Sequence, residues 1–266
     1  MERIPRIHIE DGVYYVTARG DHNGEIFKEE QDYRGYLSLL KKYKEQYGFK
    51  LFAFVLLPTQ LFLLIELREG ITLSEIMHDL NGNYTKYFNK KNSLKGHLFQ
   101  ETYKMNLLEK NQYLLYMSAY VHLYPQWLNS APQAAGYPYS SYPVYLYYAG
   151  FNVDYVNTEP ELFGLDLGMK QEVGEVLSTI KEKDYAGYLR SIPREEIKIL
   201  AQDLKKRMVL GSEEFKEAVR SRIKAYWREK CRQEMFFLQQ RLSDLEEKGG
   251  KAGEWVEEFR QMEGIK

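Results

Sequence analysis

The chain has 266 residues and a formal net charge of −1, with 44% hydrophobic and 28% charged residues. This composition is typical of a soluble globular protein, and it excludes one that binds nucleic acid through a global positive field. Cys231 is the single cysteine, which excludes an intrachain disulfide and favours a reducing compartment. The charged first residues and the lack of a membrane-length apolar run predict a cytoplasmic protein without a membrane partner.

The first half of the chain alternates between strand and helix patterns. The strand segments are β-branched and aromatic, and the helical segments carry apolar residues three and four apart. Gly48 is expected to end the first helix, and Thr72 or Ser74 to cap the second. The expected order is strand 11–20, helix 29–48, strands 49–57 and 61–67, helix 72–91 and strand 102–109. This order predicts an α+β fold of the split βαβ or ferredoxin-like kind, an antiparallel sheet with helices on one face.

The rest of the chain is expected to be largely helical. A third helix, residues 111–125, is predicted to stop near Pro125, and the tyrosine-rich segment 136–150 to lie irregularly on the domain surface and cover the sheet. The further helices are expected at 170–192, 194–211 and 212–248, the last with Ser212 at its start. We therefore predict one domain at 1–150 and an all-helical C-terminal region at 151–266 with a long terminal helix.

The last predicted helix contains a short seam of apolar residues. Met235, Leu238, Leu242 and Leu245 recur at spacings of three and four, as in a coiled coil. Such a seam packs either on its own domain or on a second copy of the chain, and the spacing alone leaves both interpretations open.

Lysines gather between Leu80 and Gln100, where acidic residues are absent. The lysines are Lys86, Lys90, Lys91 and Lys95; Tyr84 precedes them, and Tyr87 and Phe88 lie between the first two. Lysines neutralise phosphates and aromatic rings stack on unpaired bases, so this segment is a candidate nucleic-acid surface. An ordinary solvated helix face whose basic end complements the helix dipole has the same composition.

Four stretches follow one another along the chain: GVYYVTARGD, YGFKLFAFVLLP, GHLFQ and YPYSSYPVYL. In this order and spacing they give residues 12–148 a resemblance to the REP-associated tyrosine transposases, the single-tyrosine branch of the HUH nucleases. In that family two histidines on a central strand hold a divalent metal, with a polar third ligand four residues after a tyrosine. The metal polarises the scissile phosphate, and the tyrosine attacks it to form a 5′-phosphotyrosine. Family members recognise imperfect DNA hairpins and adjacent single strands.

The resemblance places Gln60 and Phe62 at the histidine positions, Tyr120 at the nucleophile and Tyr124 at the third ligand. Phe62 and Tyr124 are not ordinary ligands and Gln60 offers one weak neutral oxygen, so we expect a degenerate metal site and no cofactor. The five histidines form no HxH or HExxH pair. Tyr120 also fits a packing role, because tyrosines recur around it at helical spacing. Arg19, in the family's arginine–glycine turn, is an expected phosphate contact.

The leading hypothesis is a transposase-derived DNA-binding protein, without catalysis, that recognises hairpin or single-stranded DNA, or RNA in its place. The expected binding residues are Arg19, Lys86, Lys90, Lys91 and Lys95. The first alternative is an active single-strand DNA transposase or endonuclease that uses Tyr120 with an atypical Mg²⁺ or Mn²⁺ site. The second is a protein-interaction scaffold whose aromatic surface and last helix, residues 212–247, bind a partner chain, a homodimer being one form.

Overall fold

The computed structural model describes residues 8–9, 12–100, 103–127, 137–150, 161–162 and 165–247. Residues 6–216 form one compact unit, and the second unit contains the last helix from Glu217 onward. The larger unit holds the sheet and extends past the predicted domain boundary at residue 150. Within the described ranges, no helix is both long enough and apolar enough to cross a membrane.

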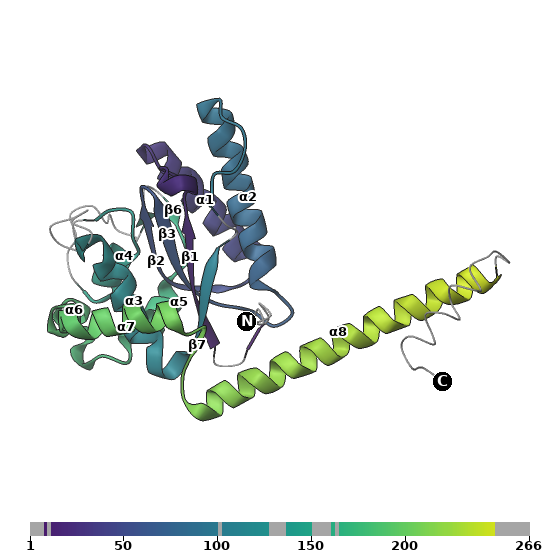
Figure 1. Ribbon diagram of the computed structural model, residues 1–266. Coiled ribbons are helices and arrows are strands. Elements are labelled where there is room, and N and C mark those ends of the chain that lie inside the picture. The colour runs from purple at the N-terminus through teal and green to yellow at the C-terminus, as the bar shows by residue number, and fades with distance from the viewer. Residues whose placement is uncertain are drawn as a thin grey trace. The chain divides into compact units, whose positions relative to one another are not determined.

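The larger unit begins with the predicted order of strands and helices (Figure 1). The elements are β1 (Gly12–Arg19), α1 (Glu30–Tyr47), β2 (Lys50–Leu57), β3 (Gln60–Glu66), α2 (Leu73–Asn92) and β4 (Lys104–Glu109). β1 lies between β3 and β4, β2 lies beside β3, and all three pairings are antiparallel. This order, 2-3-1-4, is that of a ferredoxin-like sheet, so the predicted α+β fold is confirmed.

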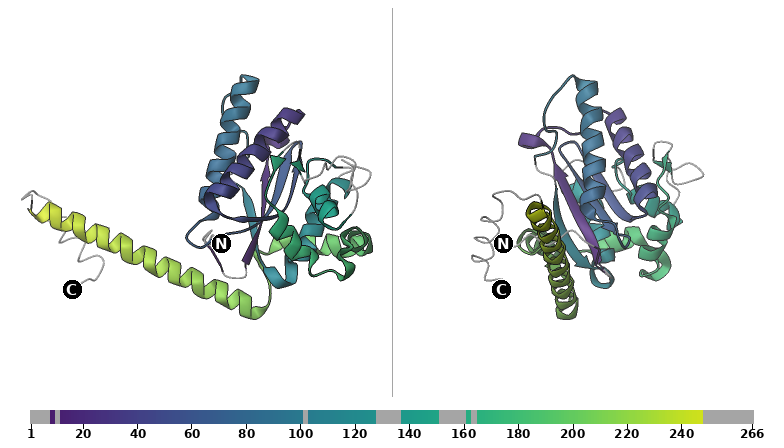
Figure 2. Two further views of the ribbon diagram at one scale, coloured as in Figure 1. Left: turned by 180° about the vertical axis from the view of Figure 1, so that it is seen from behind. Right: turned by 90° about the vertical axis from the view of Figure 1, so that its right-hand side faces the viewer.

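The two helices of this unit, α1 and α2, lie side by side on one face of the sheet (Figure 2). The Tyr36 hydroxyl of α1 donates to Asn81 Oδ1 of α2 at 3.1 Å, and the Tyr36 and Tyr84 rings meet edge-on at 5.0 Å. The apolar residues three and four apart in both helices are largely buried, and near the end of α2 Phe88 is buried whereas Tyr87 is partly exposed. Burial of these faces holds both helices on the sheet.

Both helices begin or end at residues whose chemistry determines the boundary. Gly48 ends α1 with a φ of +66°, a left-handed conformation that glycine adopts without a Cβ clash. Thr72 Oγ1 accepts from the Glu75 backbone N–H at 3.3 Å, and the Glu75 carboxylate accepts from the Thr72 backbone N–H at 2.8 Å. Of the two predicted caps of α2, Thr72 is therefore the one used.

α3 (Lys110–Trp127) covers the opposite face of the sheet from α1 and α2 (Figures 1 and 2). It packs against the strands through residues such as Tyr120, which meets Tyr15 of β1 edge-on at 5.8 Å. The predicted stop near Pro125 is confirmed, because α3 ends at Trp127, two residues after the buried Pro125. Pro125 lies within the last turn, where the missing proline N–H removes one intrahelical bond without breaking a longer run.

The tyrosine-rich segment after α3 covers the edge strand β2, as expected, but it is not wholly irregular. It contains the short helix α4 (Tyr142–Tyr148), whose inward side chains are buried. The hydroxyls of Tyr137 and Tyr145 donate to the carbonyls of Leu56 and Phe52 in β2, at 2.6 and 2.8 Å. These bonds satisfy carbonyl groups that an uncovered edge strand would offer to another chain.

The second half of the chain is mainly helical, but it also contains short strands. The elements are β5 (Glu161–Leu162), β6 (Leu165–Asp166), α5 (Lys170–Leu177), α6 (Tyr185–Ser191), α7 (Arg194–Lys206), β7 (Val209–Leu210) and α8 (Glu213–Glu247). The predicted continuous helix 170–192 is wrong, because α5 ends at Leu177 and α6 begins at Tyr185, and the segment between them includes Glu182 and Lys183 at positive φ. Asp184 then starts α6 by accepting the Gly187 backbone N–H at 2.7 Å.

β7 connects this second half to the sheet. It pairs in parallel with β4, with Leu107 opposite Val209 and Leu108 opposite Leu210. The Ser212 backbone N–H then donates to the Glu109 carboxylate at 2.7 Å, and Ser212 Oγ accepts the Phe215 N–H at 3.1 Å as α8 begins. An all-helical region would have no such strand, so that part of the prediction is corrected.

Candidate nucleic-acid interface

Three of the predicted site residues meet on the sheet face that α3 covers. Phe62 of β3 packs against Tyr124 of α3, with ring centroids 4.4 Å apart. Phe62 also stacks nearly parallel on Tyr15 of β1, at 5.9 Å and an interplanar angle of 7°. Tyr120 lies edge-on to the same Tyr15 ring at 5.8 Å and 5.9 Å from Tyr124. The structure thus brings Phe62, Tyr120 and Tyr124 together.

Two further rings belong to this group, and sequence reasoning missed both. Trp127, at the end of α3, lies 5.6 Å from Tyr120 and 6.3 Å from Tyr124. The alternation of β1 puts Tyr15 on one face of the strand, but only the β1–β3 register brings it beside Phe62. The term aromatic cluster is used below for Tyr15, Phe62, Tyr120, Tyr124 and Trp127.

Burial keeps the Tyr120 hydroxyl protonated. Its side chain is 6% exposed, and burial, with a smaller contribution from Tyr124, raises the pKa of its hydroxyl to about 12. Burial also holds the pKa of Tyr15 well above its usual value. A hydroxyl nucleophile needs a base, a metal or a lowered pKa to become reactive. The aromatic cluster supplies none of these, because its members are rings and phenols.

The predicted ligand positions do not fit a divalent metal. Mg²⁺ and Mn²⁺ prefer several oxygen ligands in octahedral geometry. Phe62 has no donor atom, Tyr124 presents a ring to Phe62, and Gln60, at the start of β3, carries one neutral amide oxygen. Among the residues that the structure describes, no group of three or more histidine, cysteine, aspartate or glutamate side chains could hold a metal ion.

His122 lies close to Tyr120 in sequence but serves the core. Its ring is fully buried, with Nδ1 2.8 Å from the Tyr185 hydroxyl and Nε2 2.7 Å from Ser141 Oγ. Burial lowers the pKa of His122 to about 3. The ring therefore stays neutral at physiological pH and ties α3 to α6 and to the segment that covers β2.

The buried neutral His122 predicts a loss of stability in mild acid. The unfolded chain binds a proton near pH 6.5, whereas the folded chain does not until about pH 3. The free energy of unfolding should therefore fall by about 1.4 kcal/mol for each pH unit below 6.5. Urea titrations of the wild type and of His122→Asn between pH 7.5 and 5 measure this slope. An equally steep slope in His122→Asn would contradict the assignment, whatever the variant's absolute stability.

Basic residues lie on the same face of the sheet as the aromatic cluster. Arg19, at the end of β1, is exposed and stands opposite Gln60. Thr17 of β1 pairs with Phe62 on one side and with Lys104 of β4 on the other, so Lys104 shares their face. Sequence analysis missed Lys104, because its position depends on the β1–β4 register. Arg19 and Lys104 are called the sheet-end cations below.

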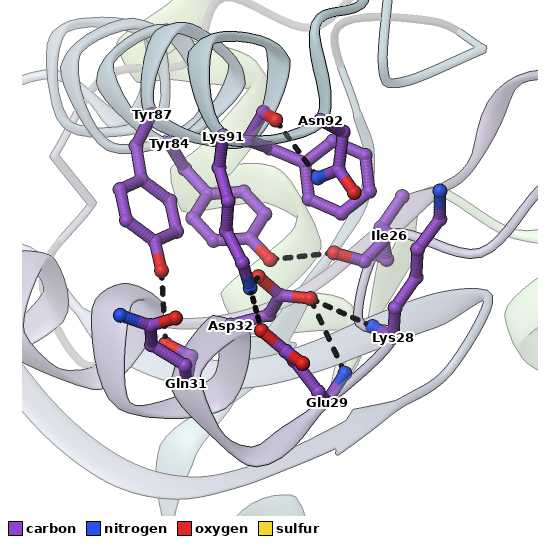
Figure 3. A network of polar contacts seen from close by, with 10 residues as sticks. Ile26, Lys28, Glu29, Gln31, Asp32, Tyr84, Tyr87, Lys91 and Asn92 are labelled. Carbon is purple, nitrogen blue, oxygen red and sulfur yellow. Dashed lines mark hydrogen bonds and ion pairs between the residues drawn. The ribbon is translucent and has the colours of Figure 1, made fainter.

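The predicted lysines of α2 fall into two groups. Lys86, Lys90 and Lys95 are exposed, and none of them pairs with a carboxylate within the described ranges. Lys91 instead reaches from α2 to Asp32 at the start of α1, and it lies 2.6 Å from Glu29 (Figure 3). Burial lowers the pKa of Lys91, but its hydrogen bonds to Asp32 and Glu29 outweigh this and raise it overall. Its charge is therefore compensated within the fold.

Asp32 is the centre of that network (Figure 3). Its side chain is fully buried, and its carboxylate accepts the backbone N–H groups of Lys28 and Glu29 at 2.9 and 3.3 Å, besides the Lys91 ammonium. Nearby, the Tyr84 hydroxyl donates to the Ile26 carbonyl at 2.5 Å. The network fixes the segment before α1 against the end of α2, so we assign Lys91 a structural role.

A groove of about 1010 Å³ runs along α2 and the segment after it. Its basic lining includes His78 and Lys86 of α2 together with His97. The rim reaches Gln100, whose backbone N–H donates to the Arg19 carbonyl at 2.9 Å. Lys86 therefore lines the same groove as Gln100, which is hydrogen-bonded to the end of β1. Lys90 and Lys95 do not line this groove. The predicted binding residues are therefore distributed over two surfaces.

Comparison with protein families confirms the class of this fold. The family described as "Transposase IS200 like" matches residues 13–123, which reach from β1 into α3 and include Tyr15, Phe62 and Tyr120 of the aromatic cluster but not Tyr124 or Trp127. Residues 13–123 are therefore similar to the IS200-like transposases. The resemblance recognised from the sequence is thereby confirmed at the level of the family.

Two solved structures are similar to the chain. One is described as a REP-associated tyrosine transposase bound to a REP hairpin; it is 17% identical, with a TM-score of 0.48, over 62% of this chain and 94% of that one. The other is a putative transposase from Deinococcus radiodurans; it is 16% identical, with a TM-score of 0.31, over 35% of this chain and 75% of that one. The comparison with curated proteins gave no match.

Proposed function

We propose that the chain is a transposase-derived protein that binds hairpin or single-stranded DNA and does not cleave it. The observation that carries this proposal is the packing of Phe62 against Tyr15 and Tyr124, at positions where the family resemblance expects metal ligands. A site filled by rings cannot stabilise the charge of a phosphoryl transition state, so it works without a metal cofactor and without catalysis.

The same face carries the groups that nucleic-acid binding needs. The sheet-end cations, Arg19 and Lys104, are exposed and have no carboxylate partner among the described residues, and such cations can neutralise phosphates. Tyr124 and Trp127 are partly exposed, and a ring that stacks on an unpaired base contributes about 1–3 kcal/mol. Cations beside partly exposed rings suit a strand whose bases are unpaired, as in a hairpin loop or its flanks.

Binding of short DNA hairpins and single strands, measured by fluorescence anisotropy at several salt concentrations, tests the proposal. The double variant Arg19→Ala/Lys104→Ala should weaken binding at least about tenfold, because each charged contact contributes about 1.5–3 kcal/mol. It should also reduce the slope of log K against log salt by up to about 2. Lys86→Ala/Lys90→Ala/Lys95→Ala measures the separate contribution of the α2 surface.

The matched control is Lys170→Ala/Lys181→Ala, which removes the same charge from exposed positions in the second half of the chain and should leave affinity unchanged. If this control weakened DNA binding as much as Arg19→Ala/Lys104→Ala does, the loss of affinity would come from the change in net charge and not from these two positions. RNA hairpins of the same sequence distinguish the two nucleic acids. The absence of binding at low salt would sink the proposal, and a covalent adduct formed with Mg²⁺ or Mn²⁺ but lost in Tyr120→Phe would establish the catalytic alternative.

A further inference from the structure

The helix α8, from Glu217 onward, presents large apolar side chains to solvent. Trp227 and Met235 are 40% and 42% exposed, and Phe236, Phe237 and Leu238 are more exposed still. Single apolar residues on a surface are ordinary, but a group of this kind on one helix marks an interaction site. Neither the sheet nor the aromatic cluster explains it.

Three of these residues, together with Cys231, form one stripe along α8. Trp227, Cys231, Met235 and Leu238 follow at spacings of four, four and three. At about 100° per residue they stay within an arc of about 80°, the width of a helix-pairing seam. Phe236, although equally apolar, points about 100° away from the next stripe residue and lies outside the seam.

The stripe has nearly the same form when read in either direction. Trp227 lies four residues before Cys231 and Met235 four residues after it. If two copies of α8 pair head to tail about a two-fold axis at Cys231, Trp227 of each copy meets Met235 of the other. Such self-complementarity is what a symmetric dimer interface requires.

The charges of α8 change sign at the same point. Residues 217–232 contain six basic and two acidic residues, and residues 233–247 contain one basic and four acidic residues. The first half therefore carries a net charge of +4 and the second half −3. Antiparallel pairing sets each basic half against an acidic half, and it places Arg228 opposite Glu234, three residues either side of Cys231. Parallel pairing would set like charges together, which disfavours that orientation.

We propose that α8 is a dimerisation helix that pairs antiparallel with the α8 of a second copy, with the two-fold axis at Cys231. The two signs of charge argue against the other occupants. A nucleic-acid strand would be repelled by the acidic half, and an anionic membrane surface would be repelled in the same way. A second copy of the same helix, paired antiparallel, places an acidic half against the basic half and a basic half against the acidic half. This inference does not depend on the proposed nucleic-acid binding.

Disulfide formation on the full-length chain tests the axis, because Cys231 is the only cysteine and is exposed. Mild oxidation should convert the wild type into a covalent dimer on a non-reducing gel, and Cys231→Ser should abolish it. In the Cys231→Ser background, Lys224→Cys should not link to itself, because two such positions lie about 21 Å apart along an antiparallel pair. Mixed with Leu238→Cys in that background, it should give a mixed dimer, since residues 224 and 238 are equidistant from Cys231.

Light scattering supplies the second measurement and a matched control. Met235→Asp places a charge in the stripe and should reduce the mass in solution from two chains to one. Phe236→Asp makes the same change at a neighbouring exposed aromatic residue outside the stripe and should leave the dimer intact. A wild-type chain that is monomeric at every concentration would overturn the proposal, as would self-linking of Lys224→Cys. A mass increase that appears only with added DNA and requires α8 would assign the helix to nucleic acid instead.

Discussion

Asp32→Ala is expected to lower the free energy of unfolding by about 3–5 kcal/mol, the range found when one partner of a buried ion pair is removed. Asp32 is fully buried, and its loss leaves two backbone N–H groups, of Lys28 and Glu29, without their acceptor. It also takes from Lys91 the more buried of its two carboxylates. The loss of hydrogen bonds to a charged acceptor adds to this cost.

Glu29→Gln is the matched control for this change. Glu29 pairs with the same Lys91 ammonium, but its side chain is 59% exposed, and an exposed ion pair contributes at most about 1 kcal/mol. Equilibrium urea unfolding of both variants gives the comparison directly. Losses of equal size would show that the ammonium, and not the buried carboxylate with its backbone bonds, is what stabilises the start of α1.

Phe62→Ala is the second large effect, with an expected loss of about 3–5 kcal/mol, as for other buried phenylalanine truncations. The side chain is 4% exposed and lies between the rings of Tyr15 and Tyr124, so its removal opens a cavity and breaks two ring contacts. Gln60→Ala, two residues earlier on the same strand and partly exposed, should cost less than about 1 kcal/mol.

This contrast tests the physical basis of the proposed function. If position 62 now serves packing, its truncation must destabilise the fold far more than truncation at position 60. Thermal and urea unfolding of the two variants measure the difference. A small loss for Phe62→Ala would mean that the pocket is loosely packed and could open to admit a ligand, which would weaken the argument that catalysis has been lost.

The strands and helices of the first half could be predicted because their signals are local. The apolar period of α1, the terminating Gly48 and the Thr72–Glu75 capping box each act within one helix, so the sequence contains the whole cause. The prediction of an all-helical second half failed where the cause is distant, because β7 forms on the edge that β4 offers it.

The candidate site shows the same division. Gln60, Phe62, Tyr120 and Tyr124 could be named from a family resemblance, and the exposed lysines from composition. The residues that contact them in the fold could not be predicted from the sequence. The pairing of β1 with β3 and β4 places Tyr15 and Lys104 at the site. Lys91 is paired with Asp32, 59 positions away in sequence, so its charge is compensated within the fold.

The sequence by itself determined that this chain contains a ferredoxin-like sheet with helical additions, because hydrophobic period and end-capping act between neighbours along the chain. Only the tertiary structure decided which tyrosine lies buried against which ring, and which lysine keeps its charge for a partner. Those properties depend on burial and on pairing across strands and helices. Such contacts join residues far apart in sequence, and no local pattern contains them.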